Sequence, residues 1–346
     1  MSDIGPDLLA HVHKTLLIDE QWTVRGAREF TWLGHRLFQR IHVSESFQSF
    51  DLEVCQLTAS TVVVDDVSEP EATVEAVLND VNRHVVGGAY SFDSESGQIV
   101  ATAGAVVHEQ TRVWRTAEFA QFAILQLCAA ETEASYLAGR TGGRLAMREH
   151  PTEGLRHAPD DMLTVLDRLI AVQGSEPTRF AVETEMHEAA DTIGRGPLAT
   201  FGATANELVF EAGFGDTTSL VTLLTDEPHR RAGNGMTVRL NLPLRGNAPE
   251  LQHLANMLNA YEAQGHPRSA HYGAWCCDDW PMASQALSYN LFVPNAFYRP
   301  GLILNIATSI SGRAMWVDRV VNETPTAVNP WVEIARRFGW SSDEDE

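Results

Sequence analysis

Apolar residues in the first part of the chain change their spacing several times, which predicts helices alternating with strands. Across residues 7–17 they recur at helical intervals, as in a short amphipathic helix. Residues 22–32 and 36–43 alternate apolar with polar side chains, and residues 50–64 are rich in β-branched side chains. We therefore expect one helix followed by three strands.

The next stretch predicts a helix, a hairpin and a second helix. Residues 73–83 place their apolar side chains on one stripe, shortly after a proline that suits the first turn of a helix. Residues 88–93 and 98–108 have the pattern of strands, and the polar loop between them ends in glycine. Residues 116–137 then show long helical periodicity.

The same order of elements returns in the second part of the chain. Helices are predicted at residues 160–172, 179–193, 248–264 and 301–321, and strands at 207–214, 219–225, 236–242, 272–277 and 286–293. A last helix is predicted at 330–338. A returning order of this kind is the sequence signature of an internal duplication.

Two short sequences repeat at matching places. Leu78-Asn79 on the middle helix of the first part answers Leu258-Asn259 in the second. The strand that follows reads GAYSFD at 88–93 and GAWCCD at 273–278, which share the pattern Gly-Ala-aromatic-x-x-Asp. The aromatic side chains of these strands are expected to pack beneath helices.

These patterns predict an α+β protein of two tandem α-β-β-β-α-β-β-α domains, with antiparallel sheets and helices packed on them. The length of 346 residues supports this division, because single cores stop growing near about 250 residues. The expected boundaries are a first domain at 1–140, a linker rich in glycine and proline at 141–159, a second and divergent copy at 160–323, and a C-terminal helix with an acidic tail at 324–346.

The net negative charge of the chain argues against nucleic acid as a binding partner. There are 46 acidic and 25 basic residues, a formal net charge of −21, which repels phosphate backbones. Membrane insertion is not expected either, because the chain has no apolar run of about 18 residues and no basic, apolar leader at its start. These features favour a cytoplasmic location, in which the four cysteines stay reduced.

No catalytic, cofactor-binding or metal-binding residues are predicted. His187 and Glu188 begin like a zinc-protease motif, but Asp191 stands where the second histidine is needed. The adjacent Cys276 and Cys277 lie on a predicted strand, so their thiols point to opposite faces and are expected to be buried one on each side. The acidic residues that follow them disfavour the thiolate that redox chemistry requires.

The element order and several local sequences resemble the class I chaperones of type III secretion and the YbjN family, which shares their fold. The local sequences are VLNDVN at 77–82, AYSFD at 89–93 and GQIV at 97–100. The resemblance covers residues 7–137 and, more weakly, 160–321, where a longer loop at 265–270 and a hairpin at 278–284 depart from it. It implies a small non-enzymatic protein that binds extended polypeptide segments, with two fused copies imitating a homodimer within one chain.

The expected function is therefore that of a peptide- or protein-binding chaperone or adaptor whose polypeptide partner the sequence does not identify. The alternatives are a structural or regulatory subunit of a larger assembly and an enzyme with an unrecognised site. The chain is expected to be a monomer built as a pseudo-dimer or a homo-oligomer. We expect the binding surface near Phe292, because strand alternation places Tyr289, Leu291 and Val293 on the core side and leaves Phe292 on a face expected to be exposed.

Overall fold

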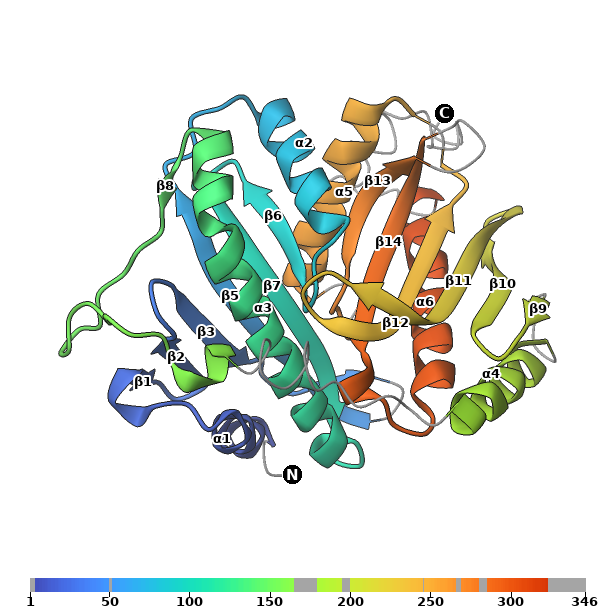
Figure 1. Ribbon diagram of the computed structural model, residues 1–346, viewed down its shortest axis with the longest axis horizontal. Helices are drawn as coiled ribbons and strands as arrows, with labels where there is room; N and C mark the ends of the chain where they lie inside the picture. The colour runs from blue at the N-terminus through green and yellow to red at the C-terminus, as the bar shows by residue number, and fades with distance from the viewer. Residues whose placement is uncertain are drawn as a thin grey trace.

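The computed structural model describes residues 4–49, 52–164, 179–194, 200–244, 246–265, 269–279 and 285–322. They form two antiparallel sheets with helices packed on them (Figure 1), which confirms the α+β class. The helices are α1 (Gly5–Leu16), α2 (Glu71–Asn82), α3 (Arg112–Thr141), α4 (Arg179–Gly194), α5 (Ala248–Ala263) and α6 (Leu302–Asn322).

The first sheet has the strand order β1-β2-β3-β5-β7-β6, with two short strands, β4 and β8, also paired to β5. The central strand β5 is long because its β-branched side chains suit extended backbone. The strands are β1 (Thr23–Arg25), β2 (Glu29–Leu33), β3 (Phe38–Val43), β4 (Phe47–Ser49), β5 (Leu52–Asp65), β6 (Ala89–Asp93), β7 (Gln98–His108) and β8 (Arg144–Leu145).

The second sheet has the order β9-β10-β11-β12-β14-β13, which repeats the order of the first sheet position by position. Its strands are β9 (Thr200–Ala203), β10 (Glu207–Phe214), β11 (Thr217–His229), β12 (Gly233–Leu242), β13 (Ala274–Asp279) and β14 (Gln285–Pro294). The two tandem copies predicted from the element order therefore have the same topology.

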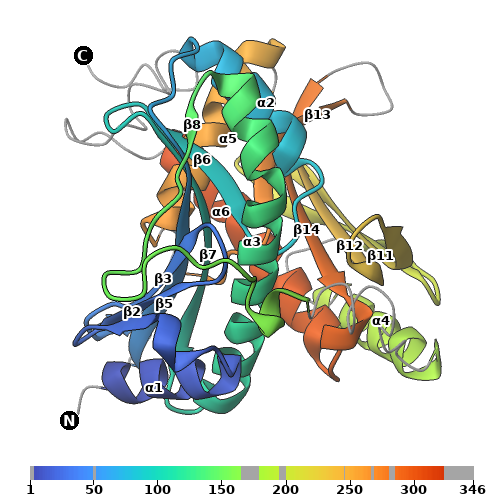
Figure 2. The same cartoon turned by 60° about the vertical axis from the view of Figure 1, so that its left-hand side comes forward.

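The two halves face opposite ways. In Figure 1, α3 crosses in front of the first sheet, whereas α6 lies behind the second, as an approximate twofold rotation would place them. Figure 2 shows α1 beside the start of α3 at one end of the first sheet. Each sheet therefore buries one face under its own long helix, and the inner edges β6 and β13 meet near the middle of the molecule under α2 and α5.

Two asparagines on each central helix hold the strands beneath it. Asn82 pairs with the backbone of Tyr90 in its own half, and Asn259 pairs in the same way with Trp275. Asn79 and Asn256 instead reach across to the opposite half. The equivalent of Asn79 is therefore Asn256, so the helix alignment of Leu78-Asn79 with Leu258-Asn259 was wrong by three residues.

The glycine of the repeated Gly-Ala-aromatic pattern is required for the same physical reason in both halves. A Cβ at Gly88 would lie 2.2 Å from the carbonyl oxygen of Thr102, and a Cβ at Gly273 would lie 2.2 Å from that of Asn290. Each glycine thus lets its strand approach the neighbouring strand of the sheet. The predicted match of the strand sequences is confirmed.

Other predicted elements differ in number as well as at their ends, because β9 was not expected and more than the three predicted strands precede each central helix. Residues 22–32 were expected to form one strand, but they form a hairpin of β1 and β2, closed where the amide of Gly26 donates to the carbonyl of Glu29. The predicted helix at 160–172 lies outside the described residues except for a 3₁₀ turn, Asp161–Thr164. The helix at 330–338 and the acidic tail also lie outside them. None of the described helices combines the length and apolarity needed to cross a bilayer.

The stretch that was expected to be a linker contacts the first half closely. Arg156 donates to the carbonyl of Leu33 and forms a 3.2 Å ion pair with Asp160, whose own amide donates to the carbonyl of Gly34. Leu163 packs against the first half near Cys128. Contacts with the first half thus continue as far as Leu163.

Candidate functional site

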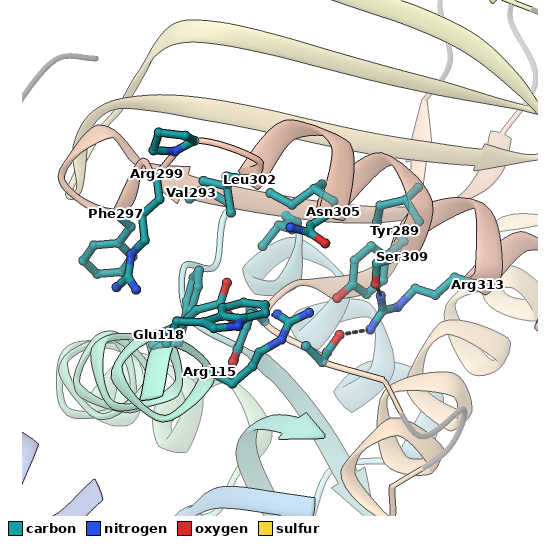
Figure 3. Close-up of a pocket in the computed structure, with 18 residues that line it drawn as sticks. Arg115, Glu118, Tyr289, Val293, Phe297, Arg299, Leu302, Asn305, Ser309 and Arg313 are labelled. Carbon is teal, nitrogen blue, oxygen red and sulfur yellow. Dashed lines mark hydrogen bonds and ion pairs between the residues drawn. The ribbon is translucent and has the colours of Figure 1, made fainter. Parts of the chain in front are cut away.

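A cleft of about 350 Å³ lies between the two halves. Its walls come from the start of α3 in the first half and from α6 in the second, and its floor comes from β14. Figure 3 shows Arg115 and Glu118 of α3 facing the α6 side chains of Asn305, Ser309 and Arg313. The volume falls at the lower end of the range of about 300–1,000 Å³ that is typical of ligand pockets.

Aromatic side chains from both halves meet at the cleft. The ring of Phe122 on α3 stacks on that of Tyr272 with centroids 3.9 Å apart, and it meets Phe297 edge-on at 5.4 Å. Leu291 and Val293 extend this apolar surface along β14. The cleft thus has an apolar lining, in which the stacked and edge-to-face aromatic pairs join the two halves.

The prediction that alternate side chains of β14 face the core is confirmed. Tyr289, Leu291 and Val293 are all buried on the side of the sheet that α6 covers. The hydroxyl of Tyr289 also accepts a hydrogen bond from the amide of Gly273 at 3.0 Å. Sequence alternation therefore identified the floor of the cleft without identifying the cleft itself.

One end of the cleft rests on a buried ion pair. Arg313 on α6 and Glu262 on α5 are each about 2% exposed and are joined at 2.8 Å, and Glu262 also accepts the indole N–H of Trp275 at 2.7 Å. Burial by itself lowers the pKa of Arg313, but the Glu262 carboxylate reverses this effect and the pKa is raised. Arg313 therefore remains charged. Its guanidinium lies over the ring of Tyr289 at 4.3 Å, at the edge of the apolar floor.

A second ion pair stands on the α3 wall. Arg115 lies 2.7 Å from the carboxylate of Glu118, one turn further along the helix, and its guanidinium also covers the ring of Trp114 at 4.1 Å. Burial, followed by the charge of Glu118, raises the pKa of the Tyr272 hydroxyl. That hydroxyl therefore stays protonated at neutral pH.

The beginning of α6 is held in place by a buried carboxylate on α4. Glu185 accepts the backbone amide of Ile303 and the hydroxyl of Tyr298, both at 2.8 Å. A carboxylate at the start of a helix satisfies amides that have no partner within the helix and complements the helix dipole. Sequence reasoning missed Glu185, because nothing local to α4 indicates which helix end it will reach.

His271 joins the halves beside the cleft. Its backbone exchanges two hydrogen bonds with Gly104 on β7, at 2.9 and 3.1 Å. His271 is 2% exposed, and its Nε2 atom has no hydrogen-bond partner among the residues that the structure describes. Burial, with a smaller contribution from Arg313, lowers the pKa of His271 to about 3, so the ring is neutral.

The structure does not support the expectation that Phe292 is exposed. This side chain is 6% exposed, and its ring centroid lies 4.7 Å from that of His229. It is on the predicted face of β14, opposite Leu291 and Val293, and it does not line the cleft. The face is covered because the turn between β11 and β12 brings His229 over it, which strand alternation cannot reveal.

The two adjacent cysteines lie where the sequence predicted. Cys276 and Cys277 are both 0% exposed, and neither forms a disulfide. Cys277 belongs to the apolar core, whereas the Cys276 sulfur meets the side-chain amide of Asn290 on the other face at 3.0 Å. Burial, and then the charge of Asp278, raises the pKa of Cys276.

Two other features lie where the halves meet. A cavity of about 650 Å³ between α2, α3 and the β11–β12 turn is lined by Arg231 and Glu133, which form an ion pair at 2.5 Å.

A cluster of potential metal ligands lies between α2 and α5. Ligand atoms of Glu71, Glu75 and His253 lie within 4.8 Å of one another, and His253 lies 2.6 Å from Glu75. Such donors suit a divalent metal, but Glu75 and His253 already bind each other.

Comparisons with protein-family models, with curated proteins and with solved structures gave no match to this chain. The cleft and its contacts are therefore the basis on which a function can be proposed.

Proposed function

We propose that the chain is a non-enzymatic polypeptide-binding protein of chaperone or adaptor type, acting in the cytoplasm. Its cleft between the halves receives apolar side chains from an extended segment of the partner. The cleft is the observation that supports this proposal. It is open to solvent, it is lined by side chains of both halves, and Phe122, Leu291 and Val293 offer it a continuous apolar surface.

The size of the cleft suits a transient interaction. Burial of one large apolar side chain contributes about 1.5–3 kcal/mol, so two such side chains contribute about 3–6 kcal/mol. A micromolar complex needs about 8 kcal/mol. The cleft alone would therefore hold a segment weakly, and backbone hydrogen bonds outside it would be needed for tighter binding.

We expect one binding site per chain in spite of the duplicated fold. Strand pairing places Ala101 opposite Tyr90 in the first half, and Tyr289 opposite Trp275 in the second. The same register makes Ala103 the counterpart of Leu291. The floor of the cleft is therefore not repeated in the first half, because its large side chains Tyr289 and Leu291 correspond to alanines there.

Short fluorescent peptides test the proposal directly. The probes carry adjacent Leu and Phe residues in a Gly-Ser background, and binding is followed by fluorescence anisotropy. Asn305→Trp should block the cleft, because Asn305 is an exposed side chain that lines it. We expect this variant to weaken binding by about tenfold or more, the equivalent of about 1.4 kcal/mol.

Thr308→Trp is the matched control, since Thr308 is exposed on the same helix and does not line the cleft. It should bind as the unchanged protein does. If the unchanged protein binds none of the probes, or if Asn305→Trp and Thr308→Trp bind them equally well, the proposal is wrong.

A further inference from the structure

The charge of the cleft is opposite to that of the chain as a whole. The chain has 46 acidic and 25 basic residues, yet the cleft is lined by three arginines, Arg115, Arg299 and Arg313, and by one carboxylate, that of Glu118. Repulsion by the distant acidic surface is screened beyond about 8 Å at physiological salt. A group inside the cleft therefore experiences mainly this local positive charge.

Two of the three arginines already have carboxylate partners. Arg115 binds Glu118, and Arg313 binds Glu262 in a buried pair. Arg299 differs, because its closest described contact is a long one of 3.4 Å to the side-chain oxygen of Gln121, a neutral group. Within the described residues, Arg299 is therefore the lining arginine whose charge is left for another molecule.

The position of Arg299 makes its charge useful for recognition. Figure 3 shows its side chain beside Phe297, at the end of the cleft away from Arg313. A carboxylate that meets a guanidinium next to an apolar wall forms two parallel charge-assisted hydrogen bonds, and these are stronger there than in open water. The same ligand can place an apolar side chain against Phe297 and Val293.

We propose that the polypeptide segment held in the cleft carries a carboxylate next to its apolar side chain, and that Arg299 receives this carboxylate. This inference rests on the proposed polypeptide-binding function. It identifies the chemistry of the ligand as an apolar side chain beside an anionic group. Either the carboxyl terminus of the partner or an Asp side chain within it could supply that group.

Pairs of probe peptides that differ in one group test the inference and separate the two sources. One pair ends in Leu-Phe as the free acid or as the amide. The other pair is amidated and has Asp or Asn directly after Leu-Phe. We expect the acid of at least one pair to bind about tenfold more tightly than its neutral partner, and the pair that shows the difference identifies the source.

Arg299→Gln should abolish that preference, and Arg299→Lys should restore part of it. Arg319→Gln is the control, because Arg319 is exposed on the last turn of α6 and does not line the cleft, so this substitution removes the same charge elsewhere. Its preference for acid should equal that of the unchanged protein.

The outcomes separate this inference from the proposed function. If neutral and acidic probes bind equally well and Asn305→Trp still weakens both, the cleft binds polypeptide but the role of Arg299 is wrong. The role of Arg299 is also wrong if Arg319→Gln reduces the preference as much as Arg299→Gln. If none of the probes binds, both proposals are overturned.

Discussion

Asn79 on α2 holds the backbone of Cys277 on β13, in the opposite half of the molecule. The Cys277 amide donates to Asn79 Oδ1 at 2.6 Å, and Asn79 Nδ2 donates to the Cys277 carbonyl at 3.1 Å. Asn256 on α5 makes the reciprocal pair of bonds with Phe92 on β6, at 2.8 and 3.3 Å. Each central helix thus supplies hydrogen bonds to the edge strand of the other half, as a strand neighbour would.

Removal of this side chain should weaken the contact between the halves. Asn79→Ala leaves the buried amide of Cys277 without its partner, and an unsatisfied buried group costs about 1–3 kcal/mol. We expect a loss of about 2 kcal/mol in the free energy of unfolding, measured by urea denaturation. Asp80→Ala, at the next and exposed position, should change it by less than about 0.5 kcal/mol. Equal effects of the two substitutions would argue against a bridging role for Asn79.

The buried ion pair should be costly to break from one side. Glu262→Gln leaves the charge of Arg313 buried without its counterion, which costs about 3–5 kcal/mol. The comparison is Asp66→Asn, which removes one charge from the exposed pair of Asp66 with Arg144 and should cost less than about 1 kcal/mol. Thermal and urea unfolding of both variants measure this difference, and similar stabilities would contradict the account of Glu262.

A carboxylate introduced beside Glu262 should have a still larger effect. Trp275 is 0% exposed, so Trp275→Asp buries a charge and removes a large core side chain at the same time. Together these effects approach the roughly 5–15 kcal/mol by which domains are stable. We expect the variant to be unfolded by circular dichroism at neutral pH, whereas a folded variant would show that the second core tolerates this change.

The stability of the protein should fall in mild acid, in part because of His271. Its pKa is about 3 in the folded chain and about 6.5 when unfolded, so below pH 6.5 only the unfolded chain takes up this proton. The contribution of neutral His271 to the free energy of unfolding is complete above pH 6.5 and is lost progressively as the pH falls toward 3. The slope from this one group is at most about 1.4 kcal/mol per pH unit.

Replacement of the ring should flatten that dependence. For His271→Gln, we expect the free energy of unfolding to change less between pH 6.5 and 4.5 than it does for the unchanged protein. Burial also lowers the pKa values of His13, His42 and His229, so part of the slope should persist. His157→Gln, at an exposed position, should retain the full slope. An unchanged slope in His271→Gln would show that the ring does not stay neutral.

The glycine of the repeated strand pattern should not tolerate a methyl group. At Gly273 a Cβ would lie 2.2 Å from the Asn290 carbonyl oxygen, so Gly273→Ala must push two strands apart. Overpacking of this kind costs about 1–3 kcal/mol. Gly213→Ala in β10 is the matched control, because a Cβ there meets no atom within 4 Å. Unfolding midpoints of the two variants should differ accordingly, and equal midpoints would show that the strands yield without strain.

The sequence by itself determined most of the secondary structure and the duplicated topology. The period of the apolar residues along β14 placed Tyr289, Leu291 and Val293 on the core side, because side-chain direction in a strand follows from backbone geometry alone. The repeated Gly-Ala-aromatic pattern was equally readable, since it reflects a local need for close strand approach. In both cases the information lies within one element or between neighbours in the chain.

Only the tertiary structure decided what covers each face and which residues meet between the halves. Phe292 is on the predicted face of its strand, yet it is buried because His229 lies over it. Asn79 and Cys277 are 198 positions apart in the chain, so no local pattern could have paired them. The cleft likewise arises where α3 of one half approaches α6 of the other. Such contacts depend on how whole elements are placed against one another, whereas periodicity records only which side of each element is apolar.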